Sequence, residues 1–218
     1  TYRDPNTPSE GDTPPAAPSP YWGDEVIWTS HANAHSFSMD EKGRVWIAAR
    51  MRANETAPFC KDGSNASSKA FPIQMSGRQM QMYDPNTKET VTIDTCFGTH
   101  HLNFDKNDTL WFTGGGPVEG WFNTKIYNET KDEQKAQGWT AFVLDTNGNG
   151  KRDAYVEPDQ PVDATKDKRY GAAFYAVSPA PDGSVWGSVL GFPGSVVRLN
   201  PGANPPETAI SEVYEPPM

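Results

Sequence analysis

HHLNFDKNDTLWFTGG, residues 100–115, is the strongest indication of the fold, because two variants of this stretch occur elsewhere in the chain. HSFSMDEKGRVWIAAR occupies residues 35–50, and YAVSPAPDGSVWGSVL occupies residues 175–190. Each copy begins with a His or Tyr, continues as an apolar strand and a polar turn, and reaches a Val/Leu-Trp pair. The Trp lies eleven residues after the His or Tyr in all three copies, at Trp46, Trp111 and Trp186. This constant spacing predicts a structural repeat.

A second hairpin is predicted after each copy of the phrase. These segments begin at Arg78, Trp139 and Ser195, and their turns contain DPNT, DTNGNG and NPGANP. Phrase and hairpin together predict a four-stranded antiparallel unit. The three units cover about residues 34–95, 99–158 and 174–216.

The repeats are longer than a minimal four-stranded blade. The tryptophans lie 65 and 75 residues apart, whereas such a blade needs about 40–45 residues. The additional residues fall at 51–77 and 117–138, which we expect to form loops on one face. Within the second segment, the residues around 130–137 could form two turns of surface helix.

Successive four-stranded sheets without intervening helices indicate an all-β fold, a β-propeller with about three blades in this chain. A β-sandwich is the structural alternative, but it does not explain the recurring register. Because propellers typically have four to eight blades, we expect the remaining blades from a longer polypeptide or another chain. Residues 21–218 would form this partial propeller, and the Pro-rich residues 1–20 a linker or a strap.

Composition excludes several classes of function. The formal net charge is −9, which argues against a nucleic-acid partner or an anionic membrane surface. No apolar run is long enough to predict a membrane span. Seven Trp and eight Tyr can supply the core area that scarce aliphatic residues do not.

Cys60 and Cys96 are the two cysteines of the chain. Both lie in segments that resemble loops, so a disulfide is the preferred interpretation and two buried thiols the alternative. A disulfide indicates an oxidising compartment, periplasmic or extracellular. It would also fix the insertion after the first repeat beside His100.

The repeated phrase, closest at TLWFTGG (residues 109–115), resembles the streptogramin lyase (virginiamycin B lyase) family over roughly residues 34–216. The resemblance implies a seven-bladed propeller and an elimination reaction that uses a His base and Mg²⁺. In that family a Glu three residues after the Trp helps to hold the metal. The corresponding residues here are Ala49, Gly114 and Val189, so these repeats do not predict a Mg²⁺ site at the channel.

The register predicts that His35, His100 and Tyr175 converge at one mouth of the channel. The two histidines are candidate bases or ligands, and Tyr175 is a candidate acid. Packing and hydrogen bonding at the strand starts is the alternative. Two further residues, Arg50 and Arg78, are candidate anion binders, and a salt bridge at the surface or between blades is the preferred alternative for them.

His101 follows directly on His100 and is a third candidate for ligand binding at the mouth. Side chains alternate along a strand, so His101 should point to the opposite side from His100 and serve as a structural partner.

The loop DTNGNGKRD, residues 145–153, is the most specific local motif in the sequence. Its oxygen donors have the spacing of a Ca²⁺-binding loop. These donors are the side chains of Asp145, Asn147, Asn149 and Asp153 and the carbonyl of Lys151. The position of the usual Glu holds Val156. The motif resembles the calcium loops of integrin-type propellers, and an Asn-Gly turn without an ion is the alternative.

Three functions remain compatible with these observations. The first is a lyase-like propeller that binds a small polar or cyclic organic ligand at the channel mouth. The second is a lyase or hydrolase with a His general base. The third is a non-catalytic module that binds a protein or glycan within an extracellular assembly.

Overall fold

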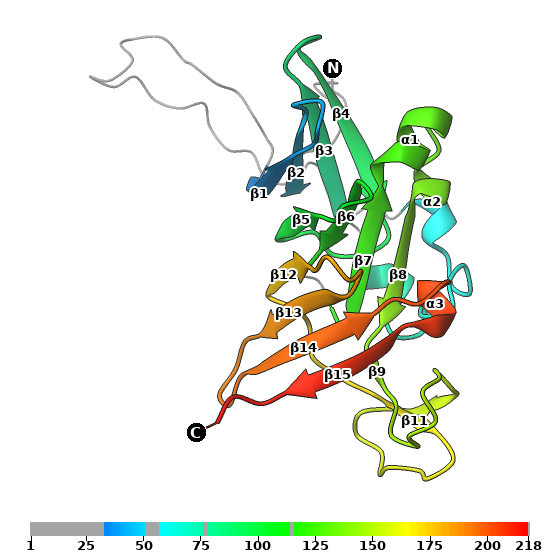
Figure 1. Cartoon of the computed structure of the whole chain (residues 1–218). Coiled ribbons are helices and arrows are strands. Elements are labelled where there is room, and N and C mark those ends of the chain that lie inside the picture. The colour runs from blue at the N-terminus through cyan, green and yellow to red at the C-terminus, as the bar shows by residue number, and fades with distance from the viewer. Residues whose placement is uncertain (1–32, 51–56, 76–77, 114–115, 218) are drawn as a thin grey trace.

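Three antiparallel sheets dominate the computed structural model (Figure 1), which describes residues 33–50, 57–75, 78–113 and 116–217. The fold is all-β and propeller-like, as the sequence predicts, and each phrase supplies the first two strands of one sheet. The predicted Pro-rich linker at residues 1–20 lies outside the described residues.

Sheet 1 and sheet 2 each contain four strands in chain order. Sheet 1 consists of β1 (Asn33–Met39), β2 (Val45–Arg50), β3 (Arg78–Asp84) and β4 (Glu89–Thr95). Sheet 2 consists of β5 (Leu102–Phe104), β6 (Thr109–Phe112), β7 (Val118–Asn123) and β8 (Gln137–Ala141).

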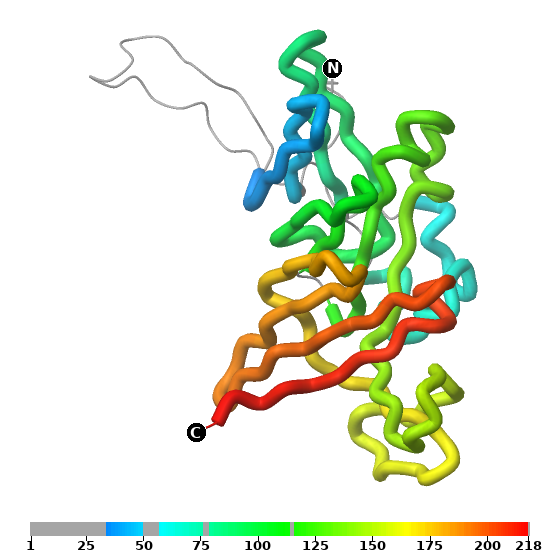
Figure 2. Tube along the Cα trace, viewed as in Figure 1, coloured from blue at the N-terminus to red at the C-terminus, as the bar shows by residue number. Residues whose placement is uncertain are grey.

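Sheet 3 has the same four-stranded core and an additional edge. Its core is β12 (Ala176–Pro179), β13 (Val185–Val189), β14 (Ser195–Asn200) and β15 (Ile210–Tyr214). Beyond β15 follow β9 (Val143–Leu144), β11 (Asp167–Arg169) and β10 (Tyr155–Val156). Figure 2 shows the chain between β9 and β11 as a yellow-green lobe that extends beyond the sheets.

In the part of the chain that the structure describes, helical structure is confined to short segments between the strands. These are α1 (Thr124–Thr130), α2 (Glu133–Ala136), α3 (Pro205–Thr208) and the 3-10 turns η1 (Pro58–Cys60) and η2 (Ile73–Met75). The side chains of Asn123 and Asp132 accept hydrogen bonds from the first turns of α1 and α2, as expected for N-caps.

The turn within the repeated phrase has the same hydrogen bonds in sheets 1 and 2. Asp40 Oδ1 accepts from the backbone N–H groups of Lys42 and Arg44, and its Oδ2 accepts from Trp46 Nε1 at 3.0 Å. Asp105 makes the equivalent bonds, including one from Trp111 Nε1 at 3.1 Å. The turn needs a positive φ at its fourth position, which Gly43 supplies in the first copy.

The second half of the second repeat differs from the prediction. We expected a hairpin around DTNGNG, but β9 and β10 do not pair with each other, and β11 lies between them. The third strand of sheet 2 is instead β7, and α1 follows it, within the predicted loop at 117–138. The described part of the other insertion, residues 57–75, contains only turns and short 3-10 segments, as expected.

The first strands of the three sheets lie at one side of the molecule, where β5 contacts both β1 and β12 (Figure 1). One apolar core, which includes Trp46, Phe122 and Met80, fills the space between sheets 1 and 2. A second core, which includes Trp111 and Phe174, lies between sheets 2 and 3. The start of β1 and the residues just before β5 and β12 therefore lie close together.

A disulfide joins Cys60 to Cys96, with 5.2 Å between the Cα atoms. The prediction of this bond is confirmed, and both cysteines are buried. In the chain-entropy model, closing a loop of this length stabilises the fold by about 3–4 kcal/mol. Because Cys96 lies four residues before His100, the bond fixes the 57–75 segment close to the start of β5. Among the described residues, no helix has the length and hydrophobicity to span a bilayer.

Candidate functional site

Three imidazole rings and one phenol ring form a cluster at the starts of the first strands. The rings of His35 and His100 are stacked, with 3.8 Å between their centroids. The His101 ring lies 5.1 Å from His35 and 4.3 Å from His100. Tyr175 completes the cluster, with its ring centroid 4.9 Å from that of His101. The structure thus brings together residues from all three copies of the phrase.

A local irregularity places His35 in this cluster. In the pairing of β1 with β2, Ala34 is opposite Ala49 and Ser36 is opposite Ala48, so His35 is the additional residue of a β-bulge. Bulges redirect a side chain out of the regular alternation and are frequent next to functional sites. The bulge therefore explains how a residue near an exposed strand end meets the second repeat.

Hydrogen bonds fix the orientation of His101. Its Nδ1 lies 2.6 Å from the backbone oxygen of Tyr175. A carbonyl oxygen only accepts, so Nδ1 carries a proton, and in the neutral ring Nε2 then holds the free lone pair. Thr113 supports this arrangement, because its Oγ1 accepts from His101 N at 3.1 Å and donates to Tyr175 O at 2.8 Å.

The expectation that His101 points away from His100 is wrong. Both residues precede β5, which begins at Leu102, so the alternation of a regular strand does not apply to them. The ring nitrogens of His35, His100 and His101 include one atom from each residue within 4.8 Å of the other two. Three nitrogen donors at this separation are a candidate metal-ligand set.

The structure describes only the backbone of the two candidate anion binders. Arg50 ends β2 and Arg78 begins β3, and their side chains lie outside the described residues. Ala49 and Val189, at the positions of the family's Glu, lie on the strands paired with β1 and β12. Neither offers an oxygen ligand for Mg²⁺.

The predicted Ca²⁺ loop is ordered by its own side chains. Asp145 Oδ1 accepts from the N–H of Gly148 at 2.7 Å, and its Oδ2 accepts from the N–H of Gly150 at 2.7 Å. The amides of Asn147 and Asn149 both donate to Asp153 Oδ2, at 2.9 and 2.5 Å. Asp145, Asn147, Asn149 and Asp153 therefore lie around one short loop.

Asp167, on β11, is a residue of this region that the loop motif does not include. Its side chain is fully buried, Oδ2 accepts from Asp153 N at 2.7 Å, and Oδ1 has no hydrogen-bond partner. Burial raises the pKa of Asp167, and the neighbouring carboxylates Asp145 and Asp153 raise it further. Its position, fourteen residues after Asp153, gave no signal in the sequence.

Glu119, on β7, is the second buried acid that sequence reasoning missed. It is fully buried, and neither carboxyl oxygen has a hydrogen-bond partner. Burial raises its pKa well above the ordinary value. Glu119 pairs with Thr140 of β8, on the face of sheet 2 that also carries Trp111 and Trp121. A charge at this position would be costly, which favours the neutral acid.

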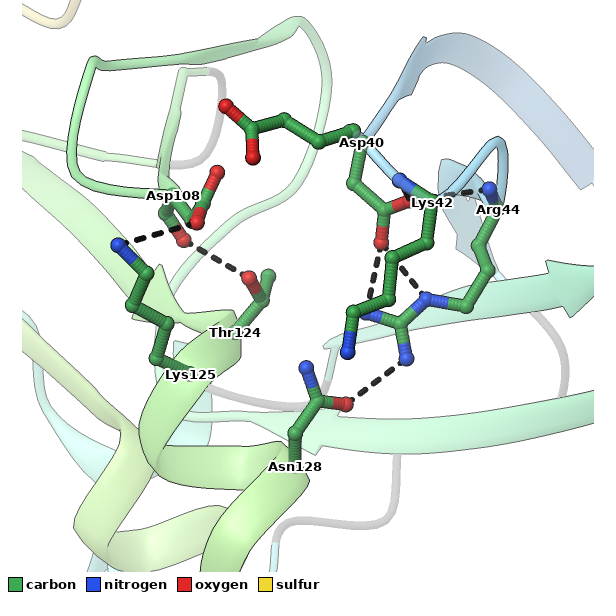
Figure 3. A pocket seen from close by; sticks show the side chains of 8 residues that line it. Asp40, Lys42, Arg44, Asp108, Thr124, Lys125 and Asn128 are labelled. Atoms are coloured by element: carbon green, nitrogen blue, oxygen red, sulfur yellow. Dashed lines mark hydrogen bonds and ion pairs between the residues drawn. The ribbon is translucent and has the colours of Figure 1, made fainter.

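A pocket of about 230 Å³ lies at the opposite end of the hairpins from the His cluster, between the turns of sheets 1 and 2 and α1 (Figure 3). Four of its six charged side chains already have partners. Arg44 binds Asp40 and the side-chain oxygen of Asn128, and Lys125 pairs with Asp108 at 3.2 Å. The pocket is smaller than the roughly 300–1,000 Å³ typical of ligand sites, so we assign it to contacts between sheets.

Comparisons with known proteins leave the family of the chain open. No family model matches it, and no curated protein matches it. A solved structure of PorZ, a surface component of the type-IX secretion system of Porphyromonas gingivalis, is 15% identical with a TM-score of 0.44. The match covers 95% of this chain and 24% of that chain, so this chain spans about a quarter of PorZ. A likeness of this degree carries no argument, and the resemblance to streptogramin lyases stays a prediction.

Proposed function

We propose that the chain is part of an extracellular or periplasmic propeller that binds a small polar ligand at its channel mouth. The ligand would contact a divalent transition-metal ion, such as Zn²⁺, held by His35, His100 and His101. The observation that carries the proposal is the convergence of one ring nitrogen from each of these residues within 4.8 Å. Imidazole nitrogen suits Zn²⁺, whereas Mg²⁺ prefers oxygen ligands.

The arrangement of His101 supports metal binding in particular. Histidines that ligate a metal commonly donate the other ring N–H to a carbonyl or carboxylate, which fixes the tautomer and the ring orientation. His101 makes this bond to the Tyr175 carbonyl. Its Nε2 is therefore available as a ligand without a change of tautomer.

Coordination requires a rearrangement of the other two rings. His35 and His100 are inclined by only 18°, and the lone pairs of nearly parallel rings do not converge on one point. The rings must splay by rotation about their side-chain bonds, and His35 is exposed, so its ring has room to turn. Three nitrogen ligands leave a further coordination position for a ligand, close to the Tyr175 ring.

The proposed location rests on the disulfide, because such bonds persist in oxidising compartments. Further blades, from the same polypeptide or another chain, would complete the channel around the cluster.

Cobalt(II) is a suitable probe of the site, since its visible absorption reports nitrogen ligation in place of Zn²⁺. We expect the 218-residue chain to develop these bands with Co²⁺ and to lose them when Zn²⁺ displaces the cobalt. His35→Ala, His100→Ala and His101→Ala should each weaken Zn²⁺ binding by about 100-fold or more. Binding should also weaken as the pH falls, because protons compete for the imidazoles.

Tyr175→Phe is the matched control. It keeps the aromatic ring and the backbone carbonyl that accepts from His101, so metal affinity should stay unchanged. If each of the three His variants still binds Zn²⁺ with unchanged affinity, the His cluster is not the metal site.

A non-catalytic protein-binding module is the second candidate. It is favoured by exposed apolar side chains on sheet 1 and directly after β13 of sheet 3. Among them are Phe37, Met39 and Leu190, each more than half exposed. A base-catalysed lyase or hydrolase remains the third. The distinguishing measurement is turnover: His100→Ala should abolish any activity of an enzyme while leaving a binding module unaffected.

A further inference from the structure

The loop at residues 145–153 contains most of a Ca²⁺ site but lacks one strong ligand. Asp145, Asn147, Asn149 and Asp153 supply side-chain oxygens, and Lys151 supplies a carbonyl. In a helix-flanked calcium loop a bidentate Glu follows at the twelfth position, where this chain has Val156. The hydrogen bonds within the loop explain its shape but do not by themselves indicate an ion.

Asp167 supplies the independent observation. It is fully buried, and its Oδ1 has no hydrogen-bond partner, which is costly for a carboxylate unless another group compensates. Its Oδ2 accepts from the backbone N–H of Asp153, itself one of the loop's candidate ligands. The pairing of β11 with β9 brings Lys168 opposite Leu144, so one step further along the strands Asp167 comes opposite Asp145. The buried carboxylate is thus directed into the loop.

We propose that Asp167 is the missing ligand and that residues 145–153 together with Asp167 bind one Ca²⁺ ion. The sheet thus supplies from β11 the carboxylate that a linear motif would place at Val156. The site is separate from the His cluster and does not depend on the proposed function.

The charge around the loop favours a divalent cation. Three carboxylates, Asp145, Asp153 and Asp167, lie close together, and among the described residues no Lys or Arg lies within ion-pair distance of any of them. Arg152 and Lys151 interact with Asp167 and Asp153 only at longer range. Carboxylate, amide and carbonyl oxygens add to about six ligands, within the 6–8 that Ca²⁺ accepts. The amides of Asn147 and Asn149 now direct their NH₂ groups at Asp153, and a half-turn of each amide would present its oxygen instead.

The ion would stabilise the junction between sheets 2 and 3. Arg152, between two of the proposed ligands, donates to Thr140 Oγ1 of β8 at 2.6 Å and to Ser67 Oγ in the 57–75 segment at 3.3 Å. Asp167 lies on β11, which pairs with β9, and β9 pairs with β15 of sheet 3. One ion would therefore fix the lobe to both sheets.

Calorimetric titration of the metal-stripped chain with CaCl₂ tests the proposal. We expect one site, weaker binding of Mg²⁺, and a Tm that rises with Ca²⁺ and falls with a chelator. Asp167→Asn should weaken Ca²⁺ binding by about 10-fold or more. Without Ca²⁺ the same variant should be at least as stable as the unaltered chain, because one of three neighbouring carboxylates has been removed.

Asp159→Asn is the matched control, since Asp159 is an exposed acid of the same lobe. This variant should bind Ca²⁺ with the affinity of the unaltered chain. His101→Ala should also leave Ca²⁺ binding intact, which separates this site from the His cluster. If Asp167→Asn does not fold, Asn149→Ala at an exposed loop position replaces it, and the same loss of affinity is expected. The proposal is overturned if the unaltered chain binds no Ca²⁺, or if the variant used binds it with full affinity.

Discussion

The carboxyl group of Glu119 makes the free energy of unfolding of the chain depend on pH. Its pKa in the folded protein lies well above the ordinary value of 4.5 because the group is fully buried. A raised pKa means that the folded state holds the proton more tightly than the unfolded state does. The contribution of the protonated Glu119 to the free energy of unfolding is complete below pH 4.5. It is lost as the pH rises through the raised pKa of the folded state.

Glu119→Gln should therefore gain stability relative to the unaltered chain as the pH increases. In this window the difference in the free energy of unfolding should change by about 1.4 kcal/mol per pH unit, since the amide does not ionise. Urea unfolding of both chains at a series of pH values measures this difference. Glu129→Gln, at an exposed position of α1, should show no such trend. A difference for Glu119→Gln that is constant with pH would contradict the assignment.

Single residues were predictable where a repeat fixed their register. The spacing from each Trp placed His35, His100 and Tyr175 at equivalent positions, and their rings do lie together. His101 was not predictable, because alternation applies within a strand and His101 precedes β5. Asp167 and Glu119 were not predictable because pairing between strands, rather than local sequence, determines their burial.

At the scale of strands and sheets, the three tryptophans occupy one register position in three different environments. Each is opposite the residue eight positions earlier in its hairpin. Trp46 lies between sheets 1 and 2 and Trp111 between sheets 2 and 3, both buried. Trp186 is half-buried and stacks on Tyr214, which is 47% exposed.

Replacement by Ala should therefore have unequal costs. Trp46→Ala and Trp111→Ala should each lower the free energy of unfolding by about 3–5 kcal/mol, and Trp186→Ala by about 1–2 kcal/mol, because its ring loses less buried area. Denaturant unfolding of the 218-residue chain measures each cost. Trp→Phe variants, which retain an aromatic ring, should keep the same order if an Ala variant does not fold. Equal costs at all three positions would contradict the described packing.

Hairpins were predictable where a tight turn connects two alternating strands. The pair β3–β4 follows that rule. The strands β14 and β15 also pair as predicted, although the short helix α3 lies in the connection between them. DTNGNG failed as a hairpin because its side chains bind their own backbone, and the strands on either side of the loop both reach β11 rather than each other. β7 was missed because Glu119 and Gly120 interrupt its apolar pattern. Gly120 is required there because a Cβ would collide with the Phe97 ring.

For the molecule as a whole, the sheets leave their outward faces incompletely covered among the described residues. Phe37 and Met39 are 69% and 59% exposed on sheet 1. Trp186 lies on sheet 3 at the position that is buried in the other two sheets. Covering both faces would require additional sheets or a partner protein, which agrees with the proposed further blades. The class of the fold followed from the repeats, whereas the edge that β9, β10 and β11 add to sheet 3 did not.

Anomalous diffraction at the zinc absorption edge, from crystals of the chain grown with Zn²⁺, would show whether His35, His100 and His101 hold a metal ion together. We expect a single strong peak bounded by these three imidazoles, next to Tyr175. Coordinates with His35 far from His100, or with no peak between the three rings, would contradict it.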